Sequence, residues 1–162
     1  MQTILLATDG SPSSENATDE AIDLATATGR TLRVVTVWNM PIVSGYGYAP
    51  YPLPRELADA EREHAHDVAA AAVAKAADAG IDATFELRTG LPAEEICAAA
   101  EESAASLIVI GAHGWGPVRR FLFGSVSTHV MHAAPCPVLV VRTEETEITD
   151  SERAAIAGAV GR

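Results

Sequence analysis

Five short apolar runs, separated by segments with helical periodicity, constrain the fold of this chain more than any other feature of its sequence. We expect strands over 4–7, 32–38, 84–88, 107–110 and 138–141, and helices over 12–28, 57–78, 92–102 and 125–133. The first and fourth runs, LLA and LIVI, lack polar alternation, which is typical of strands buried on both faces of a parallel sheet. The alternation predicts an α/β fold: a single doubly wound domain whose five-stranded parallel sheet carries helices on both faces.

Cap residues stand at the ends of the first expected helix. Ser11 fits a helix cap, Pro12 the first helical position, and Gly29 the end of that helix. The segment 39–54 breaks the pattern, because its prolines, glycines and tyrosines fit neither a regular helix nor a strand. A loop of this length in a small domain is usually functional or mobile. Its tyrosines could cover a ligand or contact a second subunit, and the sequence does not separate these two roles.

The composition limits the classes of partner. The chain has 162 residues, which fits one domain, and its 48% hydrophobic content is enough for a buried core. Its formal net charge of −11 argues against nucleic acid or an anionic membrane as partner, because like charges repel. One small anion can still bind at a local site. The acidic balance, with Lys75 as the only lysine, also predicts adaptation to a high-salt cytoplasm.

The expected location is the cytoplasm. The amino terminus has no basic segment ahead of the first strand, and the longest apolar stretch, 68–77, is too short to cross a bilayer. Cys97 and Cys136 form no spacing motif, which predicts buried free thiols in a reducing compartment.

Small residues after the fourth strand predict a phosphate site. Ligands of doubly wound sheets bind beyond the carboxyl ends of the strands, where the strand order reverses. Gly111 and Gly114 permit close approach to a ligand, and Gly124 and Ser125 open a helix whose N–H groups and positive dipole end attract phosphate. Ser127 adds a hydroxyl in the first turn of that helix. The alternative is that these glycines only shape turns.

Common nucleotide motifs are absent. GxxxxGK[ST] does not occur, and neither candidate for GxGxxG has its third glycine. A P-loop NTPase and an ordinary dinucleotide-binding dehydrogenase are therefore excluded.

The glycines instead form the pattern G-x2-G-x9-G-[ST], in which Gly111, Gly114, Gly124 and Ser125 have the required spacing. With ILLATDGS near the start, LIVIGAHG in the middle and FGSVSTHVMHAAPCPVLVVR near the end, the chain resembles the universal stress protein family over residues 1–142. Residues 143–162 lie outside the resemblance and form an acidic C-terminal extension. The resemblance implies the strand order 3-2-1-4-5 of the adenine nucleotide alpha-hydrolase-like folds.

The resemblance also implies a ligand and its contacts. In the ATP-binding branch of the family the ligand is ATP, ADP or AMP, and we expect it to bind with Mg²⁺, with no metal site from the protein alone. The implied binding residues are Ala7 against the base, Val37 at the adenine edge, Asp9 and Gly111 at the ribose, and Gly114, Gly124, Ser125, Val126 and Ser127 around the phosphates. Asp9 could also contact Mg²⁺ through the nucleotide. Ala7 departs from members with proline there, which leaves a roomier pocket. The resemblance further implies a homodimer paired through the last strand, about Val138–Val141.

Several nearby residues allow two interpretations. Asp9 could bind a ligand or only form a turn with Gly10. His113 could touch phosphate or face solvent, and the i,i+3 pair of His129 and His132 fits a metal pair less well than surface or packing residues. Arg119 and Arg120 could screen phosphate charge or keep a loop soluble.

Three functions follow as hypotheses. The first is a cytoplasmic, dimeric ATP-binding regulatory protein of the stress response, which is no enzyme beyond slow ATP hydrolysis. The second is a nucleotide-free dimeric interaction module of the same fold. The third, an enzyme that adenylates a substrate, fits poorly, because Pro12 occupies a place in the first loop where a backbone donor is needed.

Overall fold

The fold is built around one parallel sheet of five strands. The structure is a computed structural model that describes residues 2–38, 55–114 and 123–142. The strands are β1 (Thr3–Ala7), β2 (Thr31–Trp38), β3 (Ala83–Thr89), β4 (Leu107–Gly111) and β5 (Val138–Val141). Their order in the sheet is β3-β2-β1-β4-β5, and each neighbouring pair is parallel. The predicted fold class and strand order are confirmed.

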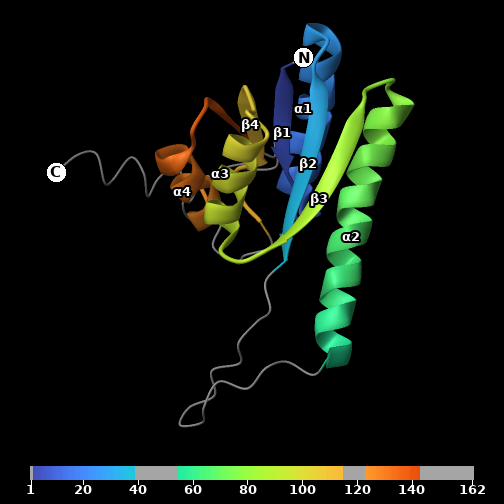
Figure 1. Cartoon of the computed structure of the whole chain (residues 1–162), viewed down its shortest axis with the longest axis vertical. Coiled ribbons are helices and arrows are strands. Elements are labelled where there is room, and N and C mark those ends of the chain that lie inside the picture. Colours follow the sequence, from blue (N-terminus) through green and yellow to red (C-terminus); the bar gives the residue numbers. More distant parts are fainter. Residues whose placement is uncertain (1, 39–54, 115–122, 143–162) are drawn as a thin grey trace, which may run out of the picture.

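Helices cover both faces of this sheet (Figure 1). They are α1 (Pro12–Thr28), α2 (Arg55–Asp78), α3 (Pro92–Glu102) and α4 (Ser125–Ala133). Buried alanines of α1 and α2 pack against Ile4 and Leu6 on one face, and α3 and α4 pack against Leu5 and Ile108 on the other. Each strand of the sequence analysis is present, and each helix begins within two residues of its expected start.

The first helix shows why the sequence fixes these ends. The side chain of Ser11 accepts a hydrogen bond from the N–H of Ser14, and Pro12 occupies the first turn, where no N–H is needed. Gly29 ends the helix in the left-handed conformation with φ 65°, which glycine adopts without a steric penalty. These residues confirm the predicted boundaries of α1.

The strand order places a reversal at the centre of the sheet. The chain moves outward from β1 to β2 and β3, and then returns across β1 to form β4 and β5. The connections after β1 and β4 therefore lead away from each other at the carboxyl ends of these strands. The crossover also brings α3 onto the face opposite α1 and α2, with its amino end at this edge of the sheet.

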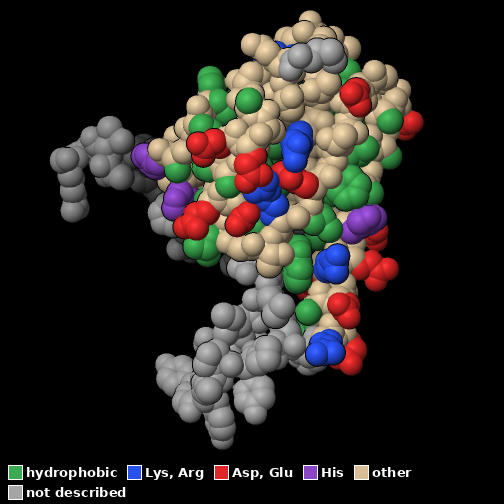
Figure 2. Space-filling view, in the orientation of Figure 1, with side chains coloured by type: hydrophobic (Ala, Val, Ile, Leu, Met, Phe, Trp, Pro, Cys, Tyr) green, Lys and Arg blue, Asp and Glu red, His purple; other side chains and the backbone are tan. Residues whose placement is uncertain are grey.

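The surface carries the acidic balance of the composition. Figure 2 shows acidic side chains, with fewer basic ones among them, over α3 and along α2. Within the described residues, no helix is long and apolar enough to cross a membrane.

Cys97 and Cys136 are free as predicted, but both are half-buried rather than fully buried. Burial raises the pKa of each thiol above its ordinary value. The predicted loop 39–54, Arg119, Arg120 and the extension 143–162 lie outside the described residues.

Candidate functional site

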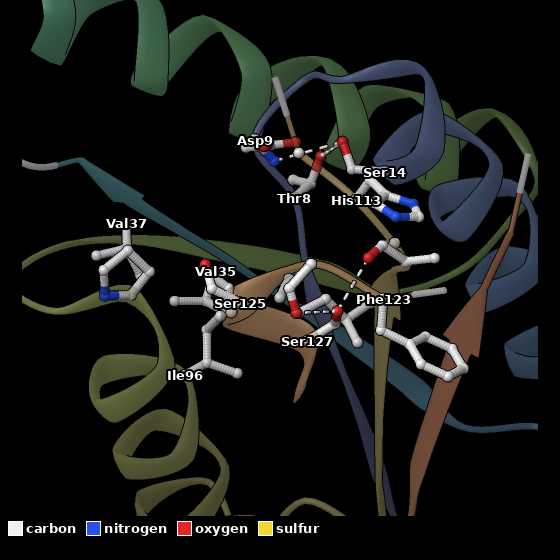
Figure 3. Close-up of a pocket in the computed structure, with 18 residues that line it drawn as sticks. Thr8, Asp9, Ser14, Val35, Val37, Ile96, His113, Phe123, Ser125 and Ser127 are labelled. Carbon is white, nitrogen blue, oxygen red and sulfur yellow. Dashed lines mark hydrogen bonds between the residues drawn. The ribbon is translucent and has the colours of Figure 1, made fainter. Parts of the chain in front are cut away.

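A cavity of about 590 Å³ lies at the carboxyl ends of the central strands (Figure 3). Residues after β1 and β4, the end of β2, and the first turns of α3 and α4 form its wall. The cavity lies where the strand order reverses, as expected for a ligand site in a doubly wound sheet. The residues that line it are Ala7, Thr8, Asp9, Ser14, Val35, Val37, Pro92, Ile96, Ile110, Gly111, Ala112, His113, Gly114, Phe123, Gly124, Ser125, Val126 and Ser127.

The structure brings together the nine binding residues that the family resemblance implied. These are Ala7, Asp9, Val37, Gly111, Gly114, Gly124, Ser125, Val126 and Ser127. They come from two parts of the chain that are about a hundred residues apart in sequence. A hydrogen bond of 3.3 Å from the Ser11 hydroxyl to the His113 carbonyl joins these two parts. Gly111, Gly114 and Gly124 therefore all lie at one cavity, although each has different neighbours.

One end of the cavity is apolar. Val35, Val37 and Ile96 line it together with Ala7 and Ile110, and Figure 3 shows Val37 and Ile96 at one side of the view. Ala7 and Ile96 are 4% and 5% exposed, so the wall of this end belongs to the buried core. An apolar slot of this kind accepts a flat ring without leaving polar groups unsatisfied.

The backbone of Val37 supplies polar groups at the edge of the apolar end. The carbonyl of Val35 accepts a hydrogen bond from the N–H of Thr8, so Val35 directs its backbone groups toward β1. Two residues further along the strand, Val37 directs its N–H and C=O to the same side. Because β1 ends at Ala7, which pairs with Val35, no residue of that strand stands opposite Val37. One donor and one acceptor are thus presented beyond the end of β1.

The other end of the cavity contains the amino terminus of α4. Gly124 is the N-cap residue and makes no side-chain cap hydrogen bond, in contrast to Ser11 at the start of α1. The first intrahelical bond joins the N–H of Thr128 to the carbonyl of Gly124. The N–H groups of Ser125 and Val126 precede that bond, and the positive end of the helix dipole lies beside them. This end of the cavity is therefore suited to an anion.

Ser127 lines the cavity, but its hydroxyl serves the fold. The side chain is only 2% exposed and donates to the carbonyl of Ala112 at 2.9 Å, with the carbonyl of Gly124 at 3.1 Å. The N–H of Gly124 also donates to Ala112, at 2.7 Å. A hydroxyl has one hydrogen to donate, and in this structure that of Ser127 is used within the fold, so its contact with phosphate stays a prediction. Ser125, which is exposed in the first turn, is the better placed hydroxyl.

Asp9 forms the turn that the sequence allowed, and it also lines the cavity, while its contact with a ligand stays a prediction. Its Oδ1 accepts the N–H of Ser11 at 3.0 Å, which is a turn-forming contact that leads the chain into α1. Its Oδ2 lies over Gly114, where a Cβ atom would stand 2.5 Å away. The absence of a side chain at Gly114 thus leaves the space that this carboxylate occupies beside the cavity.

Gly111 lines the cavity and is also required by packing against α1. A Cβ atom at this position would lie 2.8 Å from the backbone carbon of Ser13 and 2.8 Å from the N of Ser14. Gly111 therefore lets the end of β4 contact the backbone of α1. This agrees with the alternative that some glycines of the pattern shape the fold.

Sequence reasoning missed the part of the wall that comes from α3. Pro92 and Ile96 line the apolar end, and both precede β4 by a full helix. The sequence analysis considered only the residues that follow strands one, two and four. Pro92 and Ile96 reach the cavity because α3 crosses the sheet between β3 and β4. The only available signal was that a helix following the third strand must cross the sheet to reach the fourth.

A metal site made by the protein alone is not apparent in the described part of the chain. No group of three or more His, Cys, Asp or Glu side chains that could hold an ion occurs there. His129 and His132 are both exposed on α4.

The geometry agrees with the similarity of the chain to known proteins. A sequence model of the universal stress protein family matches residues 1–142. The chain belongs to the universal stress protein family. It is 39% identical over 142 residues to a universal stress protein of Thermus aquaticus, covering 87% of this chain and 98% of that protein.

Solved structures of the family share the fold. Universal stress protein UspA of Lactobacillus plantarum has a TM-score of 0.74 and 29% identity, covering 87% of this chain and 97% of that one. A further universal stress protein, solved in complex with cAMP, has a TM-score of 0.62 and 29% identity, covering 86% of this chain and 96% of that one.

Proposed function

We propose that the cavity binds an adenine nucleotide: ATP, or its ADP and AMP forms, with Mg²⁺ accompanying the phosphates. The observation that carries this proposal is the division of one cavity into an apolar end at β2 and an uncapped helix terminus at α4. A purine ring fits an apolar slot with a donor and an acceptor at its edge, and a phosphate is stabilised by helix N–H groups. The complex of a related universal stress protein with cAMP supports the same ligand class.

The bound nucleotide would lie across the carboxyl ends of the strands. The base would contact Ala7 and meet the backbone of Val37, and the phosphates would lie between Gly114 and the first turn of α4. Asp9 would face the ribose, or Mg²⁺ on the phosphates, with its Oδ2. When Mg²⁺ is bound, it neutralises phosphate charge, which otherwise disfavours binding to a protein of net charge −11.

The function proposed for this site is regulatory rather than catalytic. Slow ATP hydrolysis is the most we expect. Lys75, the only lysine of the chain, lies on α2 and pairs with Asp19 of α1, on the face of the sheet opposite α3 and α4. It is therefore not available to phosphates in the cavity. Occupancy by nucleotide would instead report energy state or stress in the cytoplasm, in keeping with the family.

Homodimer formation through β5 is the second part of the proposal. β5 is the last strand of the sheet and pairs only with β4 among the described strands. The carbonyls of Pro137 and Val141 accept hydrogen bonds from Ile108 of β4 and from Ala112 just after it, so Val140 directs its backbone groups to the open edge. Val140→Pro removes one N–H from that edge and leaves the bonds to β4 in place. We expect this variant to be a folded monomer by light scattering, and a dimer of unchanged stability would contradict β5 pairing.

The first test of nucleotide binding uses the protein as purified. Protein prepared in high salt with magnesium is denatured, and the released molecules are identified by ion-exchange chromatography with mass detection. We expect adenine nucleotide near one per chain. An empty protein that also shows no thermal shift with millimolar Mg-ATP would favour the nucleotide-free interaction module.

The second test uses variants of the polar end. Gly114→Ala places a methyl group where the Asp9 carboxylate lies, and Ser125→Ala removes the exposed hydroxyl of α4. We expect the double variant to lose at least about tenfold in ATP affinity, equivalent to about 1.4 kcal/mol. Gly80→Ala is the control for a glycine substitution away from the cavity: its φ of 76° makes alanine costly to stability, but it does not line the cavity and should leave ATP affinity unchanged. Unchanged affinity in the double variant would refute the site assignment.

A further inference from the structure

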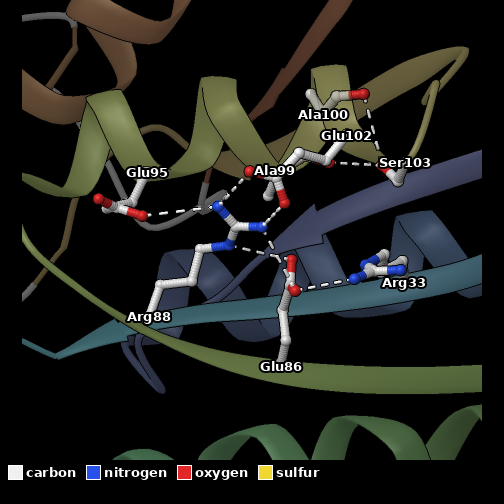
Figure 4. A network of polar contacts seen from close by, with 8 residues as sticks. All are labelled: Arg33, Glu86, Arg88, Glu95, Ala99, Ala100, Glu102 and Ser103. Atoms are coloured by element: carbon white, nitrogen blue, oxygen red, sulfur yellow. Dashed lines mark hydrogen bonds and ion pairs between the residues drawn. The ribbon is translucent and has the colours of Figure 1, made fainter.

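An ion-pair network stands behind the apolar end of the cavity (Figure 4). Arg88 of β3 contacts three carboxylates: Glu86 on its own strand, and Glu95 and Glu102 on α3. Its Nε donates to Glu86 at 3.2 Å, and its Nη1 lies 3.5 Å from Glu95 and donates to Glu102 at 3.3 Å. The side chain of Arg88 is 14% exposed, whereas its partner Glu102 is 62% exposed, so the network extends from a largely buried guanidinium to the protein surface. One guanidinium thus joins the edge of the sheet to both ends of α3.

The network lies next to the cavity wall on two elements. Arg88 is the register partner of Val37, which lines the apolar end. Glu95 directly precedes Ile96 in the first half of α3, and Ile96 lines the same end together with Pro92. The contact between Arg88 and Glu95 therefore joins the strand beside Val37 to the first turn of α3.

The first turn of α3 has no side-chain cap hydrogen bond. Its N-cap residue, Leu91, is 60% exposed. Gly90, just before it, has φ 150°, and the carboxylate of Glu95 folds over it, with Oε1 2.8 Å from where a Cβ would stand. Without its partner on β3, Glu95 would leave this turn held mainly by Ala93 and Ile96.

We propose that Arg88 is a positioning residue that holds the first turn of α3 and thereby shapes the apolar end of the cavity for the base of the ligand. The proposal rests on the proposed function for the identity of that base. Partly buried ion pairs add little net stability, because the loss of solvation offsets their attraction, but in some proteins they select one geometry. Arg88 is suited to this role because its planar group reaches several carboxylates at once, which a lysine does not. The effect should therefore appear in ligand recognition more than in global stability.

The test separates recognition of the base from recognition of the phosphates. Affinities for adenosine and for inorganic tripolyphosphate are measured by calorimetry with the full chain and with Arg88→Met. We expect the affinity for adenosine to fall roughly tenfold, within the usual range for residues that act through a neighbour, and the affinity for tripolyphosphate to stay unchanged. An equal loss for both ligands, or no loss for adenosine, would overturn the proposal.

Hydrogen exchange gives a second measurement that needs no ligand. The backbone amides of 95–97 should exchange faster in Arg88→Met, while those of α1 keep their rates. The N–H of Glu95 makes the first helical bond of α3, to the carbonyl of Leu91, so protection begins there. If the wild-type protein bound neither adenosine nor tripolyphosphate, the proposed function would fail, and unchanged exchange in 95–97 would separately overturn the positioning role.

Two further variants control for general effects of charge loss. Arg33→Met removes the 2.8 Å pair of Arg33 with Glu86, which joins β2 to β3 without a contact to α3. It should change neither the adenosine affinity nor the exchange of α3. Glu95→Gln keeps the shape of the side chain and removes only its charge, so it should reproduce the effect of Arg88→Met more weakly. If Arg33→Met had the larger effect, the network would act only on the stability of the sheet, and the proposal would be wrong.

Discussion

Replacing Gly111 by alanine tests whether this glycine serves packing or ligand binding. The new Cβ would lie 2.8 Å from two backbone atoms of α1 and 2.9 Å from a third, the carbonyl oxygen of Ser13. Backbone atoms cannot rotate away as a side-chain end can. Relief therefore requires β4 and α1 to separate by several tenths of an ångström. The φ angle of Gly111 is not in the positive region, so the backbone itself tolerates alanine and the penalty is steric.

The magnitude follows from the cost of overpacking. Inserting a methyl group into a well-packed contact destabilises a protein by roughly 1–3 kcal/mol, and the unyielding neighbours here place Gly111→Ala near about 2 kcal/mol. For a domain of this size, that lowers the melting temperature by on the order of 5 °C. Gly124→Ala is the matched comparison, because its Cβ would meet its nearest atom, the carbonyl oxygen of Ala112, only at 3.2 Å. We expect it to cost less than about 1 kcal/mol.

Urea denaturation of nucleotide-free protein, followed by circular dichroism, measures both variants without a contribution from ligand binding. Gly111→Ala should lower the midpoint and leave the slope unchanged. If Gly111→Ala were as stable as the wild type while ATP affinity fell, the glycine would serve the ligand, and the packing argument would be refuted.

Three further predictions concern other parts of the structure. Ser11→Ala should cost about 1 kcal/mol in urea denaturation, because it removes the cap of α1, and a change below about 0.3 kcal/mol would contradict that role. Burial by itself raises the pKa of Glu86, but hydrogen bonds from two arginines outweigh it and leave that pKa below its ordinary value. The stabilisation from Glu86 is therefore present above its unfolded pKa of about 4.3 and is lost as the pH falls through the lower folded pKa. In acid titrations of stability, Glu86→Gln should be less stable than the wild type near pH 7 and less sensitive to acid. A curve parallel to that of the wild type would contradict this. Because burial raises the pKa of Cys97 and Cys136, both thiols should react slowly with a disulfide reagent at pH 7.5 and fast after unfolding; rapid reaction of the native protein would count against it.

The sequence determined the elements and the fold class of this protein. Apolar runs of four to eight residues without polar alternation, bounded by turn residues, are too short for helices and fit buried strands, so the strands follow from local composition. Capping residues such as Ser11 and Gly29 act on their own helix, and their effect does not depend on distant contacts. The spacing of small residues after β4 also located one side of the cavity, because glycine and helix starts have local consequences.

Only the tertiary structure decided what each of these residues does. The same glycine pattern contains Gly111, which is packed against α1, and Gly114, which leaves space for Asp9, and both roles depend on elements about a hundred residues away in sequence. The hydroxyl of Ser127 is consumed by the carbonyl of Ala112 across the site, a contact that no spacing could reveal. The part of the cavity wall formed by α3, and the ion pairs of α3 with Arg88, depend on the crossing of α3 from β3 to β4 over the sheet. Local sequence sets the energy of each element, but distances between elements arise only when they pack around one core.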